Sequence, residues 1–346
     1  MKIVYEHYGL FFAIEVDGDQ KARLVHFSSR PYRGEEHAGY YPLIELHCLG
    51  EDTDGHHGLR HTHTYPAADM RYVSHRFQPS GENTRLEIVL SDGRLDATVF
   101  YEFYAGAPVV RCWNKVINRA DKPVTLDYVT SFAYYGLTDE VCGGWENNTA
   151  FYIAHNTWHG ELQWRKNTPF ELGLTKVNRS SLKRLTISQL GSWSSYEYLP
   201  MGVFENLEDH SCLFWQIEHN GSWGWECSDV PGGGLYLQLY GPNFSQHHFE
   251  KVLQKGKTFT SVPVAVGVRP DGFEGVVGAL TAYRRKLRRP NADNRDLPVI
   301  FNDYMNCLMG DPTEERELPL IDAAAEAGCE YFVIDAGWFS QRDGGD

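Results

Sequence analysis

Two short strand-like runs near the end of the 346-residue chain are each followed by polar side chains. Residues 331–334 precede Asp335, and residues 298–301 precede Asn302 and Asp303. A carboxylate at the end of a buried strand can accept hydrogen bonds from two vicinal hydroxyl groups, and sugars offer such pairs. The alternative is a strand-end aspartate that caps a loop by accepting hydrogen bonds from backbone N–H groups.

The segment between the two runs predicts one βαβ unit of a parallel sheet. Asp311 with Glu314 three residues later is a helix-start pattern, and Gly328 is a candidate helix end. Pro319 removes a hydrogen bond from a helix interior, so we expect a kink there or a regular helix that starts near Leu318. Function usually sits at the carboxyl ends of parallel strands, where the polar side chains lie.

Residues 1 to about 270 predict almost continuous antiparallel β-structure. Short alternating runs are separated by turn pairs, and we expect hairpins at Asp17-Gly18, Asp92-Gly93 and Asn220-Gly221. Turn-forming residues at 118–123 continue this meander. So many strands with little helix favour a sandwich that is doubled or extended.

The hydrophobic period then changes. In residues 273–289 the apolar side chains of Val276, Val277, Leu280, Tyr283 and Leu287 fall on one helical face. The proline- and asparagine-rich residues 290–298 read as a linker. We therefore expect a β domain over residues 1–290, closed by this helix, and a separate βαβ unit over residues 291–346.

Composition excludes several classes of protein. The net charge of −14 argues against a nucleic-acid partner, because phosphate binding needs clustered Lys and Arg. Seven scattered cysteines suggest reduced thiols in the cytoplasm, and the first residues lack a secretory signal. The sequence has no apolar run of about 18 residues, so we predict no membrane span. It also has no nucleotide-binding or phosphate-binding loop, so we predict no cofactor.

Several stretches resemble glycoside hydrolase family 36, the microbial α-galactosidases. FVIDAGWF is similar to the family's FVLDDGWF, and DMRYVSHRF, CLFWQIEHNGSWGWE and PVAVGV resemble segments of its first domain. IFNDYMNCL occupies the place of the first barrel strand and its NNWEA-like sequence. The resemblance implies a large β-supersandwich followed by the start of a truncated (β/α)8 barrel.

The resemblance also implies a retaining hydrolase for terminal α-galactosides such as melibiose and raffinose. The family's two catalytic aspartates lie on later barrel strands, so none is assigned here, and residues 1–346 alone are expected to be inactive. The matching Asp335 would grip the sugar hydroxyls. Trp338 would form a pocket wall or pack beneath it, and Tyr304 would be a stacking platform. Asn302 and Asp303 would point toward the same mouth.

Two departures affect the expected substrate. The family's second aspartate is Ala336 here, which cannot accept a hydrogen bond from a hydroxyl group. Tyr304 and Met305 replace Trp-Glu. These changes leave open α-N-acetylgalactosaminidase, another α-glycosidase of the family, or a sugar-binding β-protein without catalysis.

The loop GHHGLRHTHTYP holds His56, His57, His61 and His63. His61 and His63 could meet a metal ion only from an extended backbone, so we favour a polar surface loop and predict no metal site. Family members are commonly tetramers in which an N-terminal loop reaches a neighbour's active site. The resemblance therefore implies a homo-oligomer, with this loop as a candidate for that role.

Overall fold

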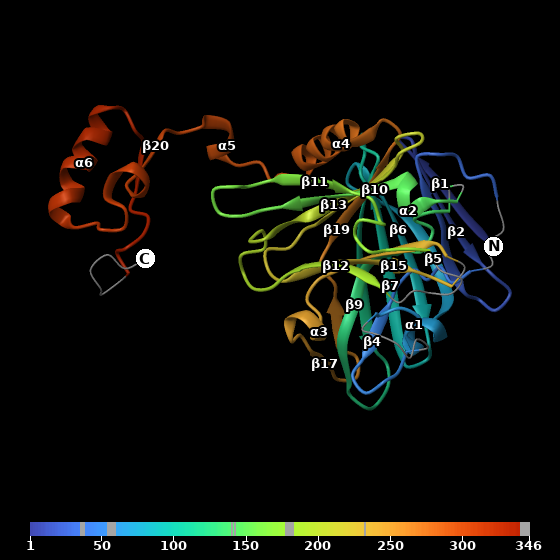
Figure 1. The fold of residues 1–346 in the computed structure, drawn as a ribbon. Helices are drawn as coiled ribbons and strands as arrows, with labels where there is room; N and C mark the ends of the chain where they lie inside the picture. Colours follow the sequence, from blue (N-terminus) through green and yellow to red (C-terminus); the bar gives the residue numbers. More distant parts are fainter. Residues whose placement is uncertain are drawn as a thin grey trace. The chain divides into compact units, whose positions relative to one another are not determined.

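The computed structural model describes residues 1–34, 39–53, 60–139, 141, 143–176, 183–231 and 233–339. His56 and His57 lie outside the described residues. The chain divides into two compact units, Met1–Lys286 and Leu287–Asp346, and Figure 1 shows their elements. The sequence predicted a boundary near residue 290.

The described part of the first unit contains three antiparallel sheets (Figure 1). The three-stranded sheet consists of β1 (Lys2–His7), β2 (Leu10–Val16) and β3 (Ala22–Ser28). The ten-stranded sheet consists of β5 (Arg71–Ser80), β6 (Asn83–Ser91), β7 (Leu95–Phe103), β8 (Val109–Asn118), β10 (Thr149–His155), β11 (Gln163–Asn167), β13 (Tyr198–Asn206), β14 (Cys212–Ile217), β18 (Thr258–Thr260) and β19 (Val264–Arg269). The six-stranded sheet consists of β4 (Leu46–Cys48), β9 (Val124–Tyr134), β12 (Arg184–Gln189), β15 (Trp223–Asp229), β16 (Leu235–Tyr240) and β17 (Lys251–Leu253).

Aromatic side chains join the sheets into one core. Trp215 on β14 and Trp225 on β15 are fully buried, and their ring centroids lie 5.1 Å apart across the two larger sheets. Phe12 on β2 meets Tyr101 on β7 at 5.0 Å, which attaches the three-stranded sheet. Burial of this apolar surface is the main stabilising contribution to such a sandwich. The prediction of a mainly β fold is confirmed.

Two of the three predicted hairpins are confirmed, and the third is wrong. Asp17-Gly18 joins the paired strands β2 and β3, and Asp92-Gly93 joins β6 and β7. Asn220-Gly221 instead connects β14 of the ten-stranded sheet to β15 of the six-stranded sheet. Residues 118–123 cross in the same way from β8 to β9, so the predicted meander also breaks there.

The crossing has a physical reason. Every residue of β14 and of β15 is buried, so each strand must be covered on both faces. Passing from one sheet to the other lets Trp215 and Trp225 pack edge to face between the two larger sheets, where both side chains are fully buried. Burial of these large side chains therefore outweighs the local preference of Asn-Gly for a hairpin.

Helix α4 (Gly272–Leu287) closes the first unit, as predicted. Val276, Leu280 and Tyr283 are buried, and the Tyr283 hydroxyl donates to Oε1 of Glu218 at 2.6 Å. The placement of Val277 on the buried face is wrong, because its side chain is 42% exposed. The short helices of this unit are α1 (Tyr65–Asp69), α2 (Trp145–Asn148) and α3 (Phe244–His247).

The second unit is the predicted strand, helix and strand. Its elements are α5 (Ala292–Asp296), β20 (Ile300–Asn302), the π-helical turn η1 (Tyr304–Leu308), α6 (Glu314–Glu326) and β21 (Tyr331–Val333). β20 and β21 pair in parallel. The linker prediction missed α5, which Asn291 caps by accepting a hydrogen bond from the backbone N–H of Asn294.

Details of α6 and β21 differ from the prediction. Thr313, rather than Asp311, is the N-cap of α6, and Pro319 lies inside the helix. Gly328 follows the helix with a φ of +82°, which suits the predicted end. β21 is not buried, since Tyr331 is 55% exposed. None of the described helices is long and apolar enough to cross a membrane.

Candidate functional site

The polar side chains predicted at the strand ends lie at one edge of the small parallel sheet. Asn302, the last residue of β20, donates from Nδ2 to Oδ2 of Asp335 at 2.6 Å. The backbone N–H of Asp335 donates to Oδ1 of Asp303 at 2.8 Å. Asp335 is exposed, and its Oδ1 receives no hydrogen bond from the described residues. One oxygen of this carboxylate is therefore held by the protein, and the other remains available to a ligand.

Two aromatic residues flank this carboxylate. The indole Nε1 of Trp338 donates to the carbonyl oxygen of Asp335 at 3.0 Å, and 67% of the Trp338 side chain is exposed. The backbone N–H of Tyr304 donates to Oδ1 of Asn302 at 2.9 Å, and Tyr304 is half-buried. An anchored, exposed indole beside a carboxylate is an arrangement that can bind a polar ligand with an apolar face. Contact of these rings with a sugar stays a prediction.

Gly337 fixes the turn after Asp335. Its φ of +92° lies in the region that favours glycine, and a Cβ there would lie 1.9 Å from the carbonyl oxygen of Gly310. The segment after η1 therefore presses directly on the backbone of this turn. The glycine of the motif is required by this contact as well as by its backbone conformation.

Asp303 lies beneath the site rather than at its surface. Only 1% of its side chain is exposed, and its backbone N–H donates to the carbonyl oxygen of Val333 at 3.2 Å. Its carboxyl group interacts with that of Glu317, which is 5% exposed and whose pKa it helps to raise. The sequence interpretation missed Glu317. The available signal was its spacing of seven residues from Ala324, which places both on the buried face of α6.

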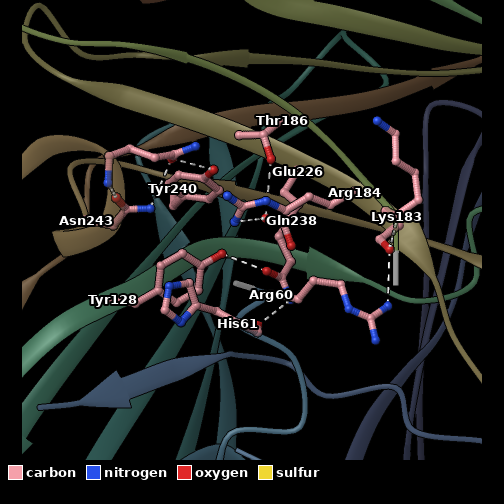
Figure 2. A network of polar contacts seen from close by, with 12 residues as sticks. Arg60, His61, Tyr128, Lys183, Arg184, Thr186, Glu226, Gln238, Tyr240 and Asn243 are labelled. Carbon is pink, nitrogen blue, oxygen red and sulfur yellow. Dashed lines mark hydrogen bonds and ion pairs between the residues drawn. The ribbon is translucent and has the colours of Figure 1, made fainter. Parts of the chain in front are cut away.

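A second cluster of polar side chains covers the six-stranded sheet in the first unit. Figure 2 shows Glu226 on β15 facing Arg184 on β12, with Nη1 of Arg184 3.1 Å from Oε2 of Glu226. The Tyr236 hydroxyl donates to Oε1 of Glu226 at 2.6 Å. Glu226 is 2% exposed, and burial raises the pKa of its carboxyl group. These contacts satisfy the charge internally, which is how buried ionic groups are normally stabilised.

The described half of the histidine-rich loop lies against this cluster. The ring of His61 stacks on Tyr128 with centroids 4.1 Å apart, and its carbonyl oxygen accepts from Nε2 of Gln238 at 2.9 Å (Figure 2). Burial lowers the pKa of His61 to about 4. His63 stacks on Tyr40 at 3.9 Å. The surface-loop interpretation is therefore wrong for these two histidines, and the described residues contain no cluster of three metal-ligating side chains.

Comparison with known proteins finds sequence similarity to α-galactosidases, and this similarity includes the second unit. The sequence model of the Melibiase family matches residues 259–346, which include the Asp335 site. Alpha-galactosidase 1 of Pediococcus pentosaceus is 25% identical over 272 residues, which cover 76% of this chain and 34% of that enzyme. Alpha-galactosidase AgaA of Geobacillus stearothermophilus is 31% identical over 96 residues, which cover 28% of this chain and 13% of that enzyme.

Solved structures extend the likeness in fold to nearly the whole chain. The GH36 α-galactosidase AgaA of Geobacillus stearothermophilus superposes with a TM-score of 0.75 and 17% identity, over 99% of this chain and 51% of that chain. The α-galactosidase of Lactobacillus brevis gives a TM-score of 0.71 and 14% identity, over 99% and 49%. In fold, and in the segments that these comparisons match, this chain is similar to the N-terminal portion of the α-galactosidases of glycoside hydrolase family 36.

The chain thus spans about half the length of its solved family 36 relatives and a third of the Pediococcus enzyme. In this part of the family fold, the structure brings Asp335, Asn302, Tyr304 and Trp338 together and buries Asp303 below them. The six described cysteines are free thiols.

Proposed function

We propose that the protein carrying this sequence is a retaining glycosidase that hydrolyses terminal α-galactosides of the melibiose and raffinose type, in carbohydrate catabolism. The observation that carries the proposal is the Asp335 carboxylate, which Asn302 holds at the end of a parallel strand within the segment that matches the Melibiase family. The AgaA structure in complex with raffinose supports the substrate class for that relative.

In this proposal the described residues bind the sugar rather than break its glycosidic bond. The free oxygen of Asp335 accepts hydrogen bonds from sugar hydroxyls, and a charged acceptor makes each bond worth about 1.5–3 kcal/mol. Trp338 covers an apolar face of the ring, with its orientation fixed by the hydrogen bond to Asp335. The chemical step needs two further carboxyl groups about 5–5.5 Å apart, and we assign neither within residues 1–346.

A second candidate is an α-glycosidase with a different glycone, and Ala336 favours it. The family motif offers a second carboxylate where this chain has a methyl group, so one hydroxyl contact must come from elsewhere or be absent. A site built to bind a hydroxyl group discriminates strongly, whereas a site without the acceptor does not. α-N-acetylgalactosaminidase is the first alternative, and a sugar-binding protein without catalysis is the second.

The test is the hydrolysis of nitrophenyl α-galactoside by the complete protein. We expect turnover, and we expect Asp335→Ala to lower kcat/KM by roughly 10²–10⁴-fold, which corresponds to two lost hydrogen bonds to a charged group. Asp322→Asn on the exposed side of α6 is the matched control and should leave kcat/KM unchanged. Turnover of nitrophenyl α-N-acetylgalactosaminide alone would move the assignment to the second candidate. Binding of galactose without turnover of any α-glycoside would leave the sugar-binding protein.

We also propose a cytoplasmic location and a homo-oligomer, with the tetramer that the family resemblance implies. The free cysteines and the acidic composition are consistent with a cytoplasmic protein. Light scattering of the complete protein and fractionation of the source cells test the two statements separately.

A further inference from the structure

Asp303 connects the ends of the two parallel strands. Its backbone N–H donates to the carbonyl oxygen of Val333 at 3.2 Å, which continues the pairing of β20 with β21. Its Oδ1 accepts a hydrogen bond from the backbone N–H of Asp335 at 2.8 Å. The preceding residue, Asn302, donates to the side chain of Asp335 at 2.6 Å. Two consecutive residues therefore hold Asp335: Asn302 binds its side chain, and Asp303 binds its backbone N–H.

The Asp303 carboxyl group faces a second carboxyl group. Glu317 on α6 is 5% exposed, and its carboxyl group interacts with that of Asp303, which is 1% exposed. Neither carboxyl oxygen of Glu317 has a donor in the described part of the chain. Two ionised carboxylates cannot hydrogen-bond to each other, because both are acceptors. The contact therefore requires one proton between them.

Among the described residues, no cation contributes to the pKa shift of Glu317 and so could replace that proton. The neighbouring basic side chain on α6, Arg316, forms an ion pair with Asp311 and is exposed. Burial first, and then the hydrogen bond and charge of Asp303, raise the pKa of Glu317 to about 7. Of the titratable groups on β20, η1, α6 and β21 that the structure describes, Asp303 is the one that shifts Glu317.

We propose that Asp303 is a positioning residue for the substrate-binding carboxylate of Asp335, and that a proton shared with Glu317 keeps Asp303 in place. This inference rests on the proposed role of Asp335. While Glu317 is protonated, its O–H donates to Asp303, and Asp303 keeps its other contact with the Asp335 backbone. When Glu317 ionises, the two buried carboxylates repel each other, and the backbone contact is weakened.

The direction of the pH effect follows from this arrangement. Below pH 7 the pair holds its proton and Asp335 is fixed, so sugar binding is strongest. As the pH rises through 7 the proton is lost, and KM should rise. Because Asp335 binds the sugar in the ground state and in the transition state, kcat should change much less than KM.

Amide substitutions at Asp303 and Glu317 distinguish a role in positioning Asp335 from a role in packing alone. Asp303→Asn keeps an oxygen for the Asp335 N–H and gives a permanent N–H donor to Glu317, so the pair no longer needs a proton. Glu317→Gln supplies the same donor from the other side. Both variants should keep the low KM of the wild type at pH 6 and should lose its rise at pH 8. Asp303→Ala removes the backbone contact and should raise KM by about 10–100-fold at every pH.

The experiment measures kcat and KM of the complete protein for nitrophenyl α-galactoside between pH 5.5 and 8.5, with Glu315→Gln on the exposed face of α6 as the matched control. A rise in KM that both amide variants abolish supports the proposal. If KM of Glu317→Gln still rises with pH as KM of the wild type does, the proposal is overturned. It is also overturned if KM of Asp303→Asn is as high as KM of Asp303→Ala.

Amide hydrogen exchange of residues 331–339 provides a readout that does not depend on turnover. The Asp335 amide should be protected in the wild type and in Asp303→Asn, and exposed to exchange in Asp303→Ala. Equal protection in all three proteins would refute the positioning role. An inactive wild type that still shows the expected exchange pattern would refute the proposed function and leave the positioning role standing.

Discussion

Glu45 offers a test of which physical effect controls a buried carboxyl group in the first unit. Its side chain is fully buried, and its Oε1 accepts from the backbone N–H of His63 and from the Tyr135 hydroxyl, both at 2.9 Å. Its Oε2 accepts from the hydroxyl of Thr64 at 2.8 Å and from the backbone N–H of the same residue at 3.3 Å. These donors favour the ionised form, whereas burial favours the neutral one.

Burial prevails, and the pKa of Glu45 rises from 4.5 to about 7. The folded state therefore holds a proton that the unfolded state has released between these two pH values. Stability must fall as the pH rises through this window, by about 1.36 kcal/mol per pH unit, or about 3.4 kcal/mol in all. Glu45→Gln has nearly the same volume and does not titrate, so it should lack this loss.

The assay is urea denaturation at pH 4.5 and pH 8, monitored by tryptophan fluorescence. This signal reports on the first unit, because all tryptophans except Trp338 lie there. Between these pH values the stability of Glu45→Gln relative to the wild type should improve by about 3 kcal/mol. Glu82→Gln, in the exposed turn between β5 and β6, is the control and should show no such change. If Glu45→Gln were instead less stable than the wild type by about 1–3 kcal/mol at pH 8, the hydrogen bonds to Glu45 would outweigh burial, and the reasoning would be refuted.

Three further substitutions test the packing. Trp225→Ala should lower the free energy of unfolding, measured in urea, by about 3–5 kcal/mol, because this side chain is fully buried. Its control, Trp158→Ala, removes a side chain that is 64% exposed and should change that free energy by less than about 0.5 kcal/mol. Gly202→Ala would place a Cβ 2.3 Å from the Trp215 ring, and a loss of roughly 1–3 kcal/mol in thermal unfolding is expected. Gly337→Ala would place its Cβ 1.9 Å from a backbone oxygen, so exchange protection at residues 331–339 should drop; unchanged protection would contradict the described turn.

The sequence predicted the type of fold more reliably than the path of the chain through it. Alternation of apolar residues and Asp-Gly turns located β2, β3, β6 and β7, because both strands of each hairpin are close in sequence. The same logic failed at Asn220-Gly221. Whether a turn joins strands in one sheet or crosses between two depends on which distant strands cover them. One neighbour of β14 is β13, which directly precedes it in the chain, but the other is the distant strand β19, and the local sequence carries no record of that second pairing.

In the candidate site, too, some features could be predicted from the sequence and others could not. Asp335 and Asn302 could be placed together from sequence, since each follows a strand of one parallel pair and the ends of such strands share an edge. The burial of Asp303 and its contact with Glu317 could not, because they depend on how α6 is rotated against the sheet. That rotation brings two carboxyl groups into contact where hydrophobicity alone would favour an apolar pair. A polar residue kept on the buried face of a helix, opposite a strand-end carboxylate, indicates that the contact has a use beyond packing, and here it lies directly beneath the residue proposed to hold the sugar.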